Sequence, residues 1–158
     1  MTPPRKASVT LREITPATVD AILALSVGEG QTRYVATNAK SIAQAHFHPE
    51  AWFRAIYADD EPVGFLMLYD GSLSPNPDKQ GQYFLWRFMI DARFQRLGFG
   101  HHALDLLVQH VRSRPNARRL LTSYVPGTGG PEGFYRKYGF RPTGGVDDDG
   151  EIEMELPL

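Results

Sequence analysis

Residues 83–104 read YFLWRFMIDARFQRLGFGHHAL, and this stretch decides the fold of the chain. The aromatic and branched apolar run from Tyr83 to Ile90 predicts a buried strand. Beyond the glycine-rich loop Gly98-Phe99-Gly100, apolar residues recur with the period of a helix, and polar residues lie opposite them. The stretch therefore predicts a strand, a tight loop and an amphipathic helix. The apolar face of that helix comprises Ala103, Leu104, Leu107, Val108 and Val111.

The junction between this loop and the helix predicts an anion site. The first N–H groups of a helix have no helical acceptor, and the helix dipole adds positive potential there, so a phosphate is favoured. Gly98 can adopt a positive φ without a Cβ penalty, and Gly100 lets the backbone approach a ligand closely. Arg96 supplies a cation beside these amides. The loop is therefore predicted to bind a phosphate-containing ligand.

The same loop fits a loose dinucleotide-binding pattern, Gly98-x-Gly100-x-x-Ala103, which is a weak signal by itself. A nicotinamide cofactor site needs an acid about 20 residues later. Near that position this chain has Arg118 and Arg119, which suit a 2′-phosphate, but too little chain follows for a second nucleotide-binding half. Nucleotide-dependent redox binding stays an alternative. A P-loop is excluded because no Gly-Lys-Ser/Thr occurs.

Two blocks of the sequence resemble the GNAT family of N-acetyltransferases. Residues 87–100, with Gln95-Arg96-x-Gly98-x-Gly100 after an apolar strand, are similar to the acyl-CoA pyrophosphate loop of that family. Residues 132–140, EGFYRKYGF, are similar to its late helix, and the two blocks have family-like order and separation. A subgroup is also indicated. The segments most similar to bacterial spermine/spermidine acetyltransferases are residues 34–36, 41–45 and 86–91.

The resemblance implies one acyl-CoA N-acyltransferase domain over residues 1–158. Its implied fold is α/β, with a central mixed, mostly antiparallel sheet and helices on both faces. Further strands are predicted at residues 9–12, 52–58, 63–69, 120–125, 140–144 and 151–156. Further helices are predicted at residues 15–25, 41–45 and 131–139, with loops at 27–38 and 71–82. In the last helix, Phe134 and Tyr138 are expected to face the core, with Tyr135 at a pocket wall.

Composition limits the classes of function. With 42% hydrophobic and 22% charged residues, the chain is typical of a globular domain, and no apolar run approaches a membrane-spanning length. The first six residues lack the apolar core of a signal peptide, so a cytoplasmic location and no membrane partner are expected. A net charge of −1 gives no general attraction to nucleic acid. The expected partner is therefore a small molecule, and a homodimer is compatible with the resemblance.

The absence of cysteine excludes several kinds of chemistry. Disulfides, thiolate metal sites and a cysteine nucleophile are all removed, so an acetyl-cysteine intermediate is excluded. The five histidines form no zinc-binding signature, and no metal is expected.

The resemblance also implies roles for individual residues. Tyr135 is implied to be the acid that protonates the leaving thiolate, because a phenol with a pKa of about 10 stays protonated at neutral pH. Two positions depart from the family. Trp86 stands where polyamine acetyltransferases of animal type carry an acid, and Thr128 replaces a usual asparagine, so the general base is unassigned. The residues implied to bind the cosubstrate are Phe88, Met89, Ile90, Arg96, Leu97, Gly98, Phe99, Gly100, His101 and Thr128. The residues implied to line the acceptor site are Glu29, Gln31, Tyr34 and Trp86.

We therefore expect an N-acetyltransferase that moves the acetyl group of acetyl-CoA to a primary amine by direct attack in a ternary complex. The expected acceptor is a polyamine such as spermidine or spermine. The acidic run Asp147-Asp148-Asp149 with Glu151 would attract a polycation, although such residues are more often solvated surface acids. Alternatives are an acceptor of another class (aminoglycoside, amino acid or protein N-terminus) and a non-catalytic CoA-binding module, which would explain the missing acid at Trp86.

Overall fold

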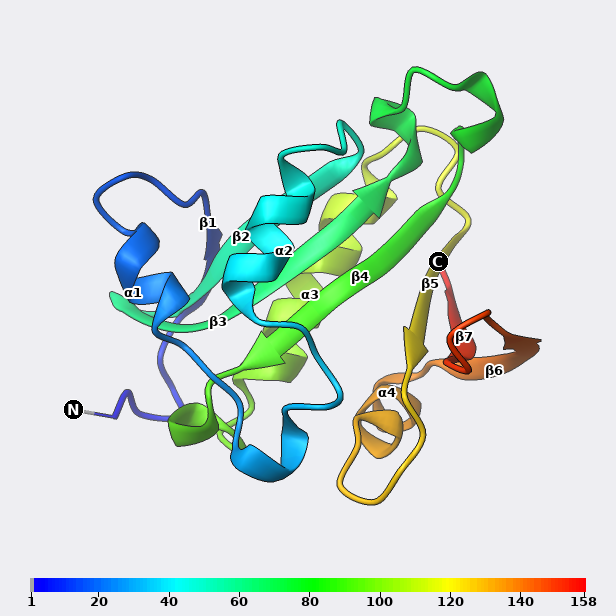
Figure 1. Ribbon diagram of the computed structural model, residues 1–158. Helices are drawn as coiled ribbons and strands as arrows, with labels where there is room; N and C mark the ends of the chain where they lie inside the picture. Colours follow the sequence, from blue (N-terminus) through cyan, green and yellow to red (C-terminus); the bar gives the residue numbers. More distant parts are fainter. Residues whose placement is uncertain (1) are drawn as a thin grey trace.

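A seven-stranded sheet forms the centre of the computed structural model, which describes residues 2–158 (Figure 1). The strand order is β1-β2-β3-β4-β5-β7-β6. Neighbouring strands run antiparallel except β4 and β5, which are parallel. The predicted mixed, mostly antiparallel sheet is confirmed. The strands are β1 (Val9–Arg12), β2 (Ala51–Ala58), β3 (Glu61–Asp70), β4 (Tyr83–Ile90), β5 (Arg119–Tyr124), β6 (Arg141–Val146) and β7 (Ile152–Pro157).

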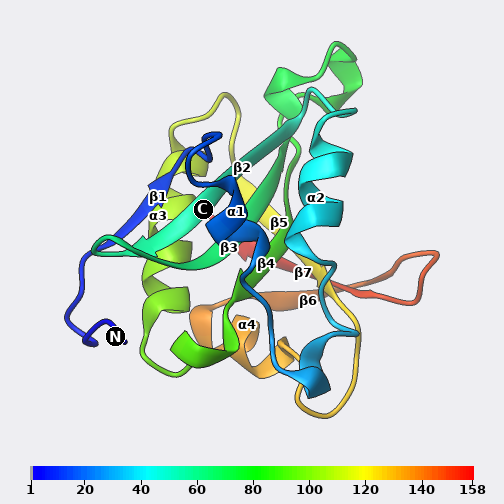
Figure 2. The ribbon, with the colours of Figure 1, turned by 60° about the vertical axis from the view of Figure 1, so that its left-hand side comes forward.

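Helices cover both faces of the sheet, as predicted. Figure 2 shows α2 on one side and α3 on the other. Two cores result: one lies between the sheet and α3, and the other lies under α1 and α2. The helices are α1 (Val19–Leu23), α2 (Asn38–Ala45), α3 (Phe99–Arg112) and α4 (Glu132–Tyr138). Short 3₁₀ segments are η1 (Glu29–Gln31), η2 (Gly71–Leu73), η3 (Pro77–Lys79) and η4 (Ala92–Phe94).

The unit of β4, loop and α3 forms as predicted. All five apolar residues expected on the inner face of α3 are buried in the first core. Burying a side chain such as Leu104 or Leu107 stabilises the fold by about 1.5–3 kcal/mol relative to leaving it exposed. This packing fixes the N-terminus of α3 against the end of β4.

Strands β4 and β5 separate after a short stretch of pairing. Only Phe84 with Leu121 and Leu85 with Thr122 are in register among the described residues, and Figure 1 shows the two strands diverging with α4 near their open ends. On its other edge β4 carries a bulge, because Arg87 pairs with Met67 and Leu85 pairs with Leu68. The residue between them is extra, and a bulge of this kind re-aims side chains. The separation and the bulge together create the space that the site occupies.

Two sequence predictions about helices need correction. The helix predicted at residues 15–25 is shorter, because Thr15 and Thr18 form a turn in which the Thr15 N–H donates to Thr18 Oγ1 at 2.9 Å. The helix predicted at 41–45 begins earlier, at Asn38, because Thr37 Oγ1 accepts from the Lys40 N–H. In α4, Phe134 and Tyr138 pack against the first core and Tyr135 lines the cavity, as predicted, but Tyr135 is also the most deeply buried of the three, which was not predicted.

Tyr135 is the buried residue of α4, whereas Phe134 and Tyr138 are only half-buried. Tyr135 belongs to the first core, where its ring contacts the ring of Phe140 and where Leu120 and Tyr124 of β5 also lie. The side chain of Tyr135 therefore points toward β5 and Phe140. The loop predicted at residues 27–38 contains η1, and the loop predicted at 71–82 contains η2 and η3. Within residues 2–158, no helix has the length and apolar character required to cross a membrane.

Candidate active site

A cavity of about 890 Å³ opens where β4 and β5 separate. Its size lies within the usual range for small-molecule sites, which is about 300–1,000 Å³. Its walls come from the end of β4, the loop before α3, the end of β5, α4 and the segment after α1. The predicted site residues that line it are Gln31, Tyr34, Trp86, Phe88, Met89, Ile90, Arg96, Gly98, Phe99, Gly100, His101 and Tyr135. Three others, Glu29, Leu97 and Thr128, lie outside its lining.

The N-terminus of α3 forms one end of this cavity. Gly98 caps the helix with a φ of +89°, in the left-handed region that glycine adopts without a Cβ penalty. Arg96 also has a positive φ, of 63°. The first helical hydrogen bond at this end runs from the His102 N–H to the Gly98 carbonyl, so the amides before it point past the end of the helix. This geometry suits an anion and agrees with the predicted phosphate loop.

Gln95 holds the loop in place. Its side-chain amide donates to the carbonyl oxygen of Ile90 and to Oε1 of Gln31, both at 2.9 Å. The loop is thereby tied to the end of β4 and to η1. Gln31, predicted to line the acceptor site, therefore also anchors the anion loop.

Gly100 lies against two aromatic rings. A Cβ atom at this position would lie 3.3 Å from Cζ of Phe134 and 3.5 Å from Cζ of Phe88. These rings stack on each other with centroids 5.7 Å apart. Only glycine lets this pair approach the first turn of α3 without displacement, so the pair forms an apolar wall directly beside the anion loop.

Tyr135 lies deep in the cavity wall, with 5% of its surface exposed. Burial raises the pKa of Tyr135 to about 12, the side chain of Thr122 opposes this shift, and the negative charge of Glu151 adds to it. The phenol therefore stays protonated at neutral pH. Its neighbours differ, because the hydroxyls of Tyr124 and Tyr138 are tied to carboxylates.

Tyr124 donates to Glu132 at 2.9 Å, and Tyr138 donates to Asp105 at 2.8 Å. In the described part of the chain, Tyr135 has no carboxylate hydrogen-bond partner of this kind. It is therefore the tyrosine of this group whose hydroxyl is not held by a carboxylate, which fits the predicted role of acid.

The other end of the cavity contains the bulged residues of β4. Trp86 packs in the second core and meets His48 edge to face, with ring centroids 5.2 Å apart. Arg87 donates to Gln44 of α2 at 2.9 Å, and burial lowers the pKa of its guanidinium. Trp86 therefore forms a packed part of the cavity wall, and Arg87 is a lining residue that the sequence did not reveal.

Glu151, one of the acids that the sequence analysis considered as an attraction for a polycation, also lines the cavity. It precedes β7 and is half-buried, and it accepts a hydrogen bond from Ser123 Oγ at 3.3 Å. In the sequence it alternates with the inward-facing Ile152 and Met154, which predicts that its side chain points away from the core. The alternation pattern correctly predicts that Glu151 points away from the core. That side of the chain is not open surface, however, because it borders the cavity between β4 and β5.

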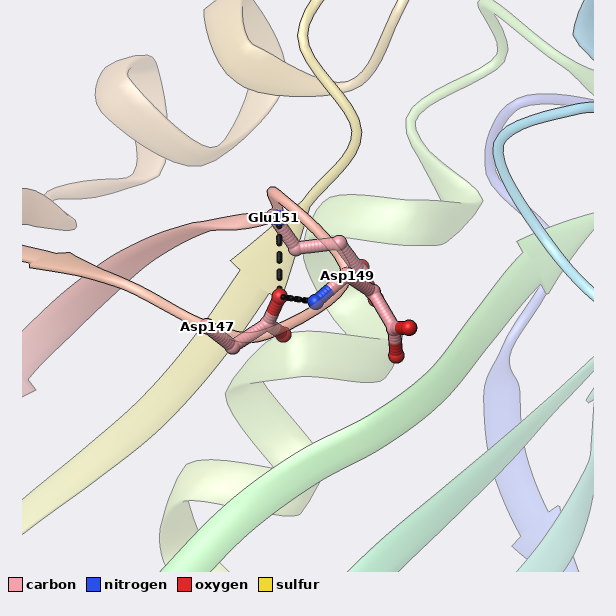
Figure 3. Close-up of side chains that lie close together, drawn as sticks. All are labelled: Asp147, Asp149 and Glu151. Atoms are coloured by element: carbon pink, nitrogen blue, oxygen red, sulfur yellow. Dashed lines mark hydrogen bonds between the residues drawn. The ribbon is translucent and has the colours of Figure 1, made fainter.

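Glu151 belongs to a group of three acids on the loop between β6 and β7, shown in Figure 3. One oxygen from each of Asp147, Asp149 and Glu151 lies within 4.8 Å of the others. Asp147 Oδ1 accepts from the N–H groups of Asp149 and Glu151 at 2.9 and 2.8 Å, which fixes the turn. The two aspartates are exposed, and such groups are common without an ion, so we assign no metal to them.

Comparison with known proteins identifies the family. The family model described as "Acetyltransferase (GNAT) family" matches residues 19–140. A spermine/spermidine N(1)-acetyltransferase of Bacillus subtilis (strain 168) is 29% identical over 157 residues, which cover 96% of this chain and 99% of that protein.

Solved structures agree in fold. A crystal structure of an aminoglycoside acetyltransferase in complex with coenzyme A has a TM-score of 0.74 at 18% identity, covering 95% of each chain. A GNAT family acetyltransferase from Elizabethkingia anophelis with acetyl-CoA bound has a TM-score of 0.62 at 16% identity, covering 96% of this chain and 97% of that one. The chain therefore belongs to the acetyltransferase (GNAT) family, and it is an N-acetyltransferase that depends on acetyl-CoA.

Proposed function

We propose that this enzyme transfers the acetyl group of acetyl-CoA to a primary amine of a polyamine such as spermidine or spermine. One observation carries the proposal: a single cavity joins the N-terminus of α3 to the protonated hydroxyl of Tyr135 and to the carboxylate of Glu151. These three features suit a phosphate, a leaving thiolate and a cationic amine, in that order.

The residues present fit the cosubstrate. The amides at the start of α3, with Arg96 beside them, would hold the pyrophosphate. Beyond Leu85, the edge of β4 that faces β5 has no strand partner among residues 2–158, so backbone groups of Phe88 to Ile90 are available to the pantetheine arm. An N–H near Ile90 would polarise the thioester carbonyl. These assignments stay predictions, as does a contact from Leu97.

Thr128 receives less support as a cosubstrate contact. Its carbonyl oxygen accepts a hydrogen bond from Tyr34, and it does not line the cavity. Glu29 likewise lies outside the cavity lining, in η1, whereas Gln31 and Tyr34 lie within it. We therefore place the acceptor wall at Gln31, Tyr34 and Trp86.

Direct attack in a ternary complex is the proposed route, because the chain has no cysteine to carry an acetyl group. A primary amine with a pKa of about 10.4 is almost wholly protonated at pH 7, so a proton must leave before the nitrogen can attack. The thiolate then needs a proton, and the buried hydroxyl of Tyr135 supplies it.

The choice of a polyamine rests on two observations. The Bacillus subtilis relative named above covers nearly the whole chain. In addition, Glu151 lines the cavity and belongs to a cluster of three acids with Asp147 and Asp149, and clustered carboxylates attract a polycation. Family membership favours an enzyme over the non-catalytic CoA-binding module. A homodimer, a cytoplasmic location and a domain spanning residues 1–158 stay predictions of the sequence.

The experiment that tests the function is release of free CoA thiol from acetyl-CoA with a panel of amines. The panel contains spermidine, spermine, putrescine, an aminoglycoside, free amino acids and a lysine peptide. The enzyme contributes no thiol to the background. We expect the highest kcat/KM with spermidine or spermine. Turnover only with amino acids or the aminoglycoside would refute the polyamine assignment, and stabilisation by NADPH but not acetyl-CoA would support the redox alternative.

A further inference from the structure

We propose that Glu151 is a catalytic residue, the general base that takes a proton from the ammonium group of the acceptor before its nitrogen attacks the thioester. This inference rests on the proposed function, and it assigns the base that the sequence left open. The position where animal-type polyamine acetyltransferases carry an acid is Trp86 in this chain, so the base must come from another element.

The position of Glu151 supports this role. The residue immediately precedes β7, which pairs with β5 along the wall of the cavity. Its neighbours on that wall are Ser123, whose hydroxyl donates to the carboxylate, and Tyr135, whose hydroxyl is affected by the charge of Glu151. Base and acid therefore face one cavity, at the point where β4 and β5 have separated.

The other candidates are eliminated by their places in the structure. Of the aspartates and glutamates in residues 2–158, Glu151 alone lines the cavity. The one histidine among the described lining residues is His101, which lies in the first turn of α3, with Nε2 3.7 Å from Asp105. It therefore belongs to the end of the cavity that suits the phosphate, away from the amine.

The position of the carboxylate is fixed by its own loop. Asp147 Oδ1 accepts a hydrogen bond from the backbone N–H of Glu151 at 2.8 Å (Figure 3). From β5, the Ser123 hydroxyl donates to the Glu151 carboxylate at 3.3 Å. A base held by neighbours in this way loses little conformational freedom when the acceptor binds.

Burial and the neighbouring charges make Glu151 a better base than a solvated acid. Burial raises the pKa of Glu151, and the negative charge of Asp147 raises it further, as does that of Asp149. The hydrogen bond from Ser123 and the positive charge of Arg87 act in the opposite direction but do not cancel the rise. A stronger base accepts the amine proton more readily, as general-base catalysis requires.

With Glu151 as the base and Tyr135 as the acid, every proton and electron pair in the acetyl transfer is accounted for. The ammonium group gives one proton to Glu151, and the nitrogen lone pair forms the C–N bond with the thioester carbonyl carbon. The C–S bond breaks, the sulfur takes the Tyr135 proton, and a second proton from the nitrogen returns to the phenolate. The products are the acetylated amine, the free thiol and protonated Glu151, which releases its proton to water.

The test compares Glu151→Gln with Glu153→Gln. Glu153 lies two residues along β7, on the same face, and accepts from Thr143 at 2.8 Å outside the cavity lining. Both changes remove one negative charge, and the two residues lie two positions apart on the same side of the chain. Three quantities are measured with spermidine: kcat/KM, its dependence on pH, and the affinity for coenzyme A by calorimetry.

We expect kcat/KM of Glu151→Gln to fall about 100-fold at pH 7 with coenzyme A affinity unchanged. The remaining activity should rise about tenfold per pH unit toward the amine pKa, because only the neutral amine reacts when the base is absent. The unsubstituted enzyme and Glu153→Gln should instead show kcat/KM that is nearly flat from pH 7 to pH 9.

Two results would overturn the assignment while leaving the proposed function in place. One is Glu151→Gln with unchanged kcat/KM and a flat pH profile. The other is an increase in the KM for spermidine alone with kcat intact, which would make Glu151 a binding residue only. If the unsubstituted enzyme acetylates no amine, the proposed function fails and this inference fails with it.

Discussion

The hydroxyl of Tyr34 donates a 2.7 Å hydrogen bond to the carbonyl oxygen of Thr128, which joins two loops 94 residues apart in the chain. Tyr34 lines the cavity, and Gly130, on the same loop as Thr128, lies close enough that a Cβ atom there would be 3.0 Å from the Tyr34 ring. One side of the acceptor end is therefore closed by this pair.

Loss of this hydroxyl should loosen the acceptor end of the cavity. In Tyr34→Phe the ring remains but the link to Thr128 is lost, and a hydrogen bond of this kind contributes about 1 kcal/mol. We expect the KM for spermidine to rise about fivefold, with kcat and the affinity for coenzyme A little changed. Steady-state kinetics with spermidine measure this. An unchanged KM would show that the closure has no part in acceptor binding.

The hydroxyl of Tyr135 should be required for turnover. Tyr135→Phe removes only the proton donor, and we expect kcat to fall about 100-fold while the affinity for coenzyme A stays the same. Tyr124→Phe is the matched control, since its hydroxyl donates to Glu132 and the residue is outside the cavity lining. Steady-state kinetics give kcat for both variants, and calorimetry gives their affinity for coenzyme A. Equal kcat in the two variants would assign the acid to another group.

Gly100 should tolerate no side chain. A methyl group there would press on Phe134 at 3.3 Å, so Gly100→Ala should weaken coenzyme A binding about fivefold by displacing the aromatic wall or the amides. The control is Gly133→Ala in α4, where nothing lies within 4 Å of the added atom. Calorimetric titration of both variants with coenzyme A provides the comparison. Equal affinity in both would indicate that the wall adjusts without cost.

Asp91 should make stability depend on pH. The residue is 3% exposed and accepts hydrogen bonds from the Ser26 N–H at 2.9 Å, the Arg93 N–H at 3.0 Å and Arg93 Nε at 2.8 Å. Burial by itself would raise the pKa of Asp91, but the hydrogen bonds from Arg93 and Ser26 outweigh it, and the pKa is lowered. Its stabilising effect is therefore complete above the unfolded pKa of about 3.9 and is lost as the pH falls through the lower folded pKa.

Asp91→Asn should accordingly destabilise the fold by about 1–3 kcal/mol at pH 7. The difference from the unsubstituted protein should shrink as the pH falls below about 4, because the carboxyl group of the unfolded chain is protonated first and that of the folded protein follows at lower pH. Urea unfolding at pH 7 and at pH 3 measures both values. The same difference at the two pH values would mean that the ionised carboxylate is not the stabilising form.

The parts of the molecule that depend on local sequence were predictable. The strand from Tyr83 to Ile90 and the helix after Gly98 follow from periodicity and glycine placement, and both formed as expected. The burial of Tyr135 was not predictable in the same way, because α4 is a short helix whose orientation is set by β5 and Phe140 rather than by its own pattern.

Glu151 shows the other limit of sequence reasoning. Alternation along β7 correctly directed it away from the core, but only the separation of two parallel strands distant in sequence turns that side into a cavity wall. The bulge that places both Trp86 and Arg87 at the acceptor end is likewise a property of strand pairing. Such pairings have no local signature in a single sequence.

The most direct test of the whole account is a crystal structure with coenzyme A and spermidine bound together. We predict the pyrophosphate at the amides that begin α3, the sulfur within about 3.5 Å of the Tyr135 hydroxyl, and a primary nitrogen of spermidine within about 3.2 Å of the Glu151 carboxylate or one water away from it. A ternary complex in which the amine binds away from Glu151, or the sulfur away from Tyr135, would contradict the account.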